Sequence, residues 1–171
     1  MDTLFGLPSH VLIVHAVVVL GPLAALLGLG IAIRPGWAFY LRWPVLVLSL
    51  ISAGAAILAA SAGEALEERL GGNALIEQHA EDGEMLRLVT IIYLSVAVLA
   101  FLSITVRSPL QSRRGDFTSR LPAVLGPVSR GLLAAAAIWL IVQTTITGHS
   151  GATAVWRDVV QYTSTPRGEA Q

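Results

Sequence analysis

Two histidines stand at the head of the first long apolar run, in the sequence Ser9-His10-Val11-Leu12-Ile13-Val14-His15. No charged residue occurs between Asp2 and Arg34, so His15 is an ionisable ring in an otherwise apolar segment. Ionisable side chains are costly in hydrocarbon, and their presence there indicates a functional site by default. An imidazole binds a proton near neutral pH, and its neutral form ligates transition metals and haem iron.

A second polar group lies around His149, near the end of the last apolar run. Gln143, Thr147 and Ser150 follow the four-then-three spacing of one helix face. Buried polar groups need hydrogen-bond partners, so such a face also serves as a purely structural network. We expect five side chains to support a site in this region: His79, Arg87, Gln143, Thr147 and Ser150.

The composition indicates which elements must position these residues. Of the 171 residues, 54% are hydrophobic and only 13% are charged, whereas soluble domains carry about 25% charged residues. This deficit indicates a membrane protein. Equal numbers of basic and acidic residues give no bulk attraction to nucleic acid. The chain has no cysteine, which excludes disulfides and thiolate chemistry.

Four segments are apolar over roughly 20 residues, the length that crosses a hydrocarbon core of about 30 Å. They are residues 11–33, 44–62, 86–106 and 131–148. The expected fold class is therefore all-α, a polytopic four-transmembrane-helix bundle. It forms a single domain over residues 1–162, and residues 163–171 are expected to be a disordered tail.

Local signals refine these boundaries. Pro8 suits the opening turn of the first helix, and Gly126-Pro127 is interpreted as a break before the fourth. Residues 61–64 (Ser-Ala-Gly-Glu) match a capping box, which predicts either a short surface helix or an extension of the second span. Helical spacing of apolar residues over 74–87 indicates that the third helix begins above the membrane.

The charges of the connections predict the orientation. The first and third connections hold most of the arginines: Arg34, Arg42, Arg107, Arg113, Arg114, Arg120 and Arg130. The middle connection, residues 64–87, carries seven acidic residues and two arginines. Arginine-rich connections stay in the cytoplasm. Both termini and the acidic connection are therefore predicted to be extracytoplasmic.

Counting residues along each helix from its arginine predicts that four ionisable side chains lie at the same height in the bundle, which we call the polar level. The separations are 19 residues for His15 from Arg34 and His149 from Arg130, 20 for Arg87 from Arg107, and 22 for Glu64 from Arg42. At a rise of about 1.5 Å per residue, these four side chains fall within roughly 5 Å of one level. His10 and His79 lie five and nine residues higher.

The level suggests a cofactor site. Two imidazoles and a carboxylate suit a transition metal held by His15, His149 and Glu64, with His10 as a further ligand. Alternatively, His15 and His149 ligate a b-type haem from opposite sides, with Arg87 near a propionate. His10 and His15 are five residues apart and point about 140° away from each other on a helix, which departs from the i, i+4 pair of helical metalloproteases.

The motifs resemble those of a bacterial membrane family, domain of unknown function 2231, and of its actinobacterial branch. The matching segments are residues 6–15, 61–70, 79–80 and 147–152. The family's His-Pro-x-x-x-His pattern is altered here, since Val11 replaces the proline after His10. The resemblance implies four helices and no established activity. It also implies a bacterial cytoplasmic (inner) membrane location, with the lipid bilayer as partner.

Three functions remain open from the sequence. The first is transition metal or haem binding, in electron transfer or metal handling. The second is a structural or accessory membrane protein, alone or as a homo- or hetero-oligomer, whose histidines only satisfy helix ends. The third is a pH-sensing site, since imidazoles titrate near neutral pH. No glycine-rich phosphate loop, serine elbow or paired-carboxylate motif occurs, so the sequence does not predict an enzyme or any catalytic residue.

Overall fold

The computed structural model describes residues 3–4, 7–70, 73–109 and 115–164. Four long helices form a bundle: α1 (Ser9–Ile33), α2 (Ala38–Leu70), α3 (Ala74–Ser103) and α4 (Leu125–Ser164). All four are long and apolar enough to cross a membrane, which confirms the predicted all-α membrane fold. The predicted tail, residues 163–171, lies outside the described residues from 165 onward.

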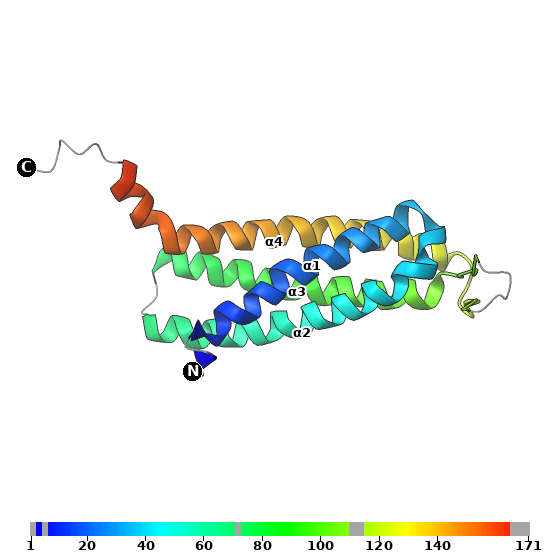
Figure 1. Ribbon diagram of the computed structural model, residues 1–171, viewed down its shortest axis with the longest axis horizontal. Helices are drawn as coiled ribbons and strands as arrows, with labels where there is room; N and C mark the ends of the chain where they lie inside the picture. Colours follow the sequence, from blue (N-terminus) through cyan, green and yellow to red (C-terminus); the bar gives the residue numbers. More distant parts are fainter. Residues whose placement is uncertain (1–2, 5–6, 71–72, 110–114, 165–171) are drawn as a thin grey trace, which may run out of the picture.

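The helices alternate in direction around the bundle. α1 packs against α2 and α4, and α3 packs against the same two helices, so neighbours in the chain are also neighbours in space. The start of α1 and the end of α4 lie at one end of the bundle together with the α2–α3 connection (Figure 1). The short 3-10 helix η1 (Pro35–Trp37) and the α3–α4 connection lie at the opposite end.

All four helices begin before the predicted spans, and α2 and α4 also end after them, because hydropathy reports contact with lipid, whereas a helix continues until a local signal ends it. α3 ends at Ser103, three residues before its predicted end. α2 runs through the capping-box sequence, and the Ser61 hydroxyl donates to the Ile57 carbonyl instead of capping a new helix (3.2 Å). Asn73 caps α3, since its side-chain oxygen accepts from the amides of Leu75 and Ile76 (3.0 Å each). The third helix thus begins at Ala74, as its apolar spacing indicated.

Two prolines take different places from those predicted. Pro127 lies inside the first turn of α4, where its missing N–H has no helical partner to lose, so it does not break the helix. Pro8 belongs to the two-residue strand β2 (Leu7–Pro8), which pairs antiparallel with β1 (Thr3–Leu4). The helix that it was expected to open begins one residue later, at Ser9.

Small residues let the helices approach closely. Ala53, Ala56 and Ala59 of α2 are buried, as the small-residue spacing of that segment indicates. Between α3 and α4, the hydroxyls of Ser103 and Ser129 form a buried hydrogen bond of 2.7 Å. Large apolar side chains such as those at positions 19, 50 and 138 are exposed on the outside, where lipid contacts them.

One aromatic side chain connects helices across the bundle diagonal. Tyr93 of α3 is completely buried, and its hydroxyl donates to the carbonyl of Ala24 in α1 (2.6 Å). Gly28 makes room for this hydroxyl, because a Cβ atom at that position would lie 2.4 Å from it. A buried tyrosine hydroxyl needs a partner, and this carbonyl supplies it.

Candidate functional site

His10 joins α1 to α2 at the end of the bundle where the chain begins. Its Nδ1 lies 2.8 Å from the carbonyl oxygen of Ala59. A carbonyl only accepts, so Nδ1 donates, and in the neutral ring the lone pair is on Nε2. The ring packs on Gly63, where a Cβ atom would lie 3.1 Å from Cε1 of the imidazole.

His79 makes the equivalent connection between α3 and α4. The Ser150 hydroxyl donates to the Thr147 carbonyl (3.1 Å), so it accepts from Nδ1 of His79, which is 3.2 Å away. The His79 ring also has a hydrogen bond to the Thr147 main chain. The His79 ring packs directly on Gly151, because a Cβ atom at position 151 would lie 2.8 Å from Cε1 of the imidazole.

Asp82 lies one turn after His79 on α3 and interacts electrostatically with its ring. Its main-chain carbonyl accepts from the Gln143 amide (3.2 Å) and from the Thr147 hydroxyl (3.0 Å). One side-chain oxygen of Asp82, Oδ2, is buried and has no hydrogen-bond partner. Buried carboxylate oxygens without a partner are rare, and each calls for an explanation.

The two connections lie at the same end of the bundle. His79 is close enough to His10 and to Asp82 for its charge to interact with both. We call the group formed by these three residues with Gln143, Thr147 and Ser150 the histidine end of the bundle. It combines two imidazoles from opposite helical hairpins with one carboxylate, and the polar face of α4 holds the set in position.

The residues placed at the predicted polar level are distributed differently. His15, Glu64 and His149 are all exposed, on α1, α2 and α4 respectively. His149 lines a shallow groove of about 470 Å³ between α3 and α4, whose lining also includes Asp82 and Ser150. Among the described residues, no three His, Asp or Glu side chains gather closely enough to hold a metal ion. The metal or haem site of His15, His149, His10 and Glu64 therefore stays a prediction.

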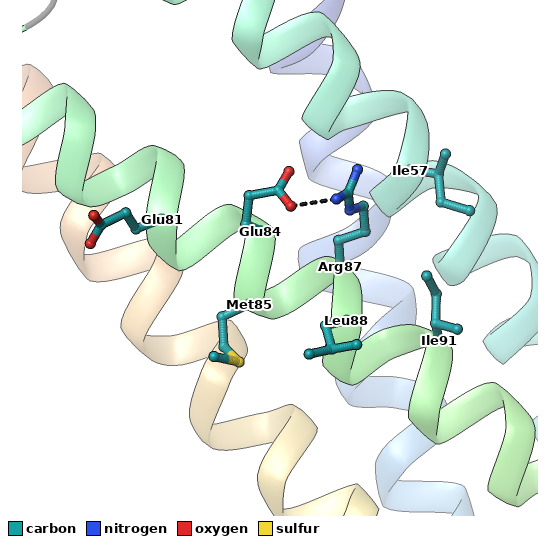
Figure 2. Close-up of a pocket in the computed structure, with 7 residues that line it drawn as sticks. All are labelled: Ile57, Glu81, Glu84, Met85, Arg87, Leu88 and Ile91. Carbon is teal, nitrogen blue, oxygen red and sulfur yellow. Dashed lines mark hydrogen bonds and ion pairs between the residues drawn. The ribbon is translucent and has the colours of Figure 1, made fainter.

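Arg87 pairs with Glu84, one turn before it on α3, and the pair lies towards α2 (Figure 2). Both partners of this ion pair belong to α3. It leaves Arg87 beside a groove between α2 and α3 and outside the hydrogen-bond network of the histidine end.

Asp82 is the residue of the histidine end that the sequence analysis did not select. It was one of seven acidic residues in the middle connection. The signal that distinguishes it is its i, i+3 spacing from His79, which places both side chains on the same helix face once α3 is known to begin at Ala74.

The histidine end lies opposite three of the arginines. Arg34, Arg42 and Arg130 belong to the end formed by η1 and the α3–α4 connection. There the Arg42 guanidinium lies 5.2 Å from the ring centre of Phe101 and 5.1 Å from that of Phe117. Such aromatic contacts stabilise a cation in a partly apolar setting.

No curated protein and no solved structure matches the chain. A family model described as a predicted membrane protein, domain of unknown function 2231, matches residues 6–164. Because the match covers almost the whole chain, the protein belongs to this family of membrane proteins.

Proposed function

We propose that the protein is a multi-pass membrane pH sensor whose histidine end binds protons on the extracytoplasmic side. The observation that carries the proposal is that His10 and His79 each bond the two helices of one hairpin at the same end of the bundle, where His79 interacts electrostatically with His10 and Asp82. Imidazole is the side chain whose ordinary titration falls between about pH 5 and 8. Its placement between hairpins couples that titration to helix packing.

At neutral pH each imidazole connects the two helices of its own hairpin. Protonation of both rings then places two like charges between the hairpins. Two unit charges about 4 Å apart repel by about 4 kcal/mol at an effective dielectric constant of about 20, and the repulsion falls in inverse proportion to their distance. Asp82 compensates one of these charges, and α4 contributes only neutral partners to His79, Ser150 and Thr147.

The second proton therefore lacks a local anion among the groups that interact with His79. Its repulsion lowers the stability of the contact between the α1–α2 and α3–α4 hairpins. We expect this end of the bundle to be closed at pH 7.5 and to open as the pH falls towards 5. The arginines at the opposite end support the extracytoplasmic placement in this proposal.

Spin labels test the opening directly, since the chain has no cysteine of its own. Cysteines replacing Glu64 on α2 and Ala152 on α4, both exposed, carry the labels on opposite hairpins. In lipid nanodiscs, the distance between labels measured by electron paramagnetic resonance is expected to be longer at pH 5 than at pH 7.5.

Two histidine variants provide the comparison. His79→Gln keeps a polar side chain but removes one titrating ring, so the pH response of the distance should disappear. His15→Gln is the matched control on an exposed imidazole and should retain the response. Distances that do not change with pH, or a response that survives His79→Gln, would show that the histidines act only as structural connections.

A further inference from the structure

A groove of about 590 Å³ runs along the face of α3 beside α2, away from the hydrogen-bond network of the histidine end. One residue of α2 and six of α3 line it: Ile57, Glu81, Glu84, Met85, Arg87, Leu88 and Ile91 (Figure 2). The described apolar residues of this lining are exposed although they belong to helices that cross the membrane. The groove therefore opens towards lipid.

The groove has a charged part and an apolar part. Glu81, Glu84 and Arg87 come from successive turns of α3 on the side of the histidine end. Glu84 and Arg87 lie on the α2 side of α3, and Glu81 extends from the α4 side (Figure 2). Leu88 and Ile91 continue towards the middle of the helix, with Ile57 of α2 opposite Ile91 (Figure 2). From Glu81 to Ile91 the helix rises about 15 Å, so the groove passes from charged surroundings into the hydrocarbon region.

The charged part offers both signs to a ligand. Arg87 donates to Glu84, and the two side chains are 36% and 47% exposed, so the pair faces the groove rather than the core. A guanidinium has five N–H donors, and one ion pair leaves others for a second anion. Glu81 supplies a further exposed carboxylate with no ion pair to a described residue.

We propose that this groove binds a phospholipid with a primary-amine headgroup, of the phosphatidylethanolamine type. Its phosphate contacts Arg87, its ammonium contacts Glu81 and Glu84, and one acyl chain lies along Leu88 and Ile91. The three protein charges sum to −1, and this headgroup carries one anionic and one cationic group in matching order.

The same charges disfavour other headgroups. Phosphatidylglycerol is anionic. Its phosphate would lie near two carboxylates, and its headgroup has no cation to pair with them. Phosphatidylcholine carries a cation, but its quaternary ammonium has no N–H to donate to a carboxylate, and charge-assisted hydrogen bonds are the stronger contacts. A primary-amine headgroup has both a cation to pair with the carboxylates and N–H groups to donate to them.

Native mass spectrometry of the full chain in detergent tests the proposal. The protein is mixed with equal amounts of phosphatidylethanolamine, phosphatidylcholine and phosphatidylglycerol that have identical acyl chains. We expect the first to be retained about fivefold more than either of the others, which is the upper range for a partly exposed ion pair.

Variants separate the parts of the groove. Glu81→Gln should bring retention of the amine lipid down to that of phosphatidylcholine, while Glu77→Gln, an exposed glutamate one turn earlier on α3, should change nothing. Leu88→Trp fills the apolar part and should lower retention of all three lipids.

Two results would overturn the proposal. The first is equal retention of the three lipids, or a preference for phosphatidylglycerol, by the unmodified chain. The second is a loss of preference in Glu77→Gln equal to that in Glu81→Gln, since net charge rather than the groove would then select the lipid. The proposal is independent of the pH response, because neither Glu81 nor Leu88 belongs to the histidine end.

Discussion

Replacing Gly28 by alanine tests how the diagonal contact holds the bundle together. The new methyl group would lie 2.4 Å from the hydroxyl oxygen of Tyr93, about 1 Å closer than an ordinary contact. The ring is completely buried, so it has no free space into which to move. Its hydroxyl must therefore leave the carbonyl of Ala24, to which it donates at 2.6 Å.

The cost follows from three terms. Overpacking a buried site costs about 1–3 kcal/mol, and the lost hydrogen bond about 1 kcal/mol. Alanine in place of a helical glycine stabilises the helix by about 1 kcal/mol. We expect Gly28→Ala to lower the free energy of unfolding by roughly 2 kcal/mol, and Tyr93→Phe, which only loses the hydrogen bond, by about 1 kcal/mol.

The double variant distinguishes this explanation from a general loss of packing. Without the hydroxyl, the nearest atoms to the new methyl are Cγ of Leu133 and Cζ of the ring at position 93, each 3.4 Å away, which is ordinary contact. Adding Tyr93→Phe to Gly28→Ala should therefore restore stability, to a loss of at most about 1 kcal/mol. Two independent effects would instead add to about 3 kcal/mol.

Reversible unfolding of the purified chain in mixed detergent micelles, followed by circular dichroism, measures these free energies. Gly28→Ala with unchanged stability would refute the steric argument. A double variant that is less stable than Gly28→Ala would show that the hydroxyl and the methyl do not compete for the same space.

Further predictions concern orientation, the fit of an imidazole and the cofactor. A single cysteine at Leu75 should react with an impermeant maleimide in intact cells, and one at Thr118 should not; the opposite result would place the histidine end in the cytoplasm. Gly148→Ala, with no atom within 4 Å of the new methyl, should gain about 1 kcal/mol of unfolding free energy because alanine favours the helix, whereas Gly151→Ala should displace the His79 ring and lose that gain through a broken hydrogen bond of about 1 kcal/mol. Elemental analysis and an optical spectrum of the purified chain test the predicted metal or haem; a bound group that disappears when either predicted axial histidine is replaced by alanine would support it.

The number of helices and their membrane-crossing character follow from the sequence because both depend on composition over about 20 residues. The ends of the helices do not. Pro127 has the residue type of a helix breaker, and only its position in the first turn of α4 makes it compatible with the helix. Likewise, a capping sequence does not end α2 at Ser61, since no local signal there favours leaving the helix.

For the site, too, only part of the arrangement could be predicted from the sequence. Counting residues places a side chain at a height along a helix but does not say which way it points. His10 and His15 differ by about 140° around α1, so when His10 contacts α2, the face of His15 is turned away. This rotation explains why the histidines that the structure brings close, His10 and His79, are those that counting placed above the level.

The length of α4 gives the protein a mechanical property. Its 40 residues rise about 60 Å along the helix, while the hydrocarbon core takes up only about 30 Å of it. The residues after Ser150 extend past the histidine end by about 21 Å, and there the helix bends away from the bundle (Figure 1). A tilt of about 10° in this part moves its far end by roughly 4 Å. Small changes in helix packing at the membrane surface therefore produce larger displacements at the end of α4, outside the bilayer.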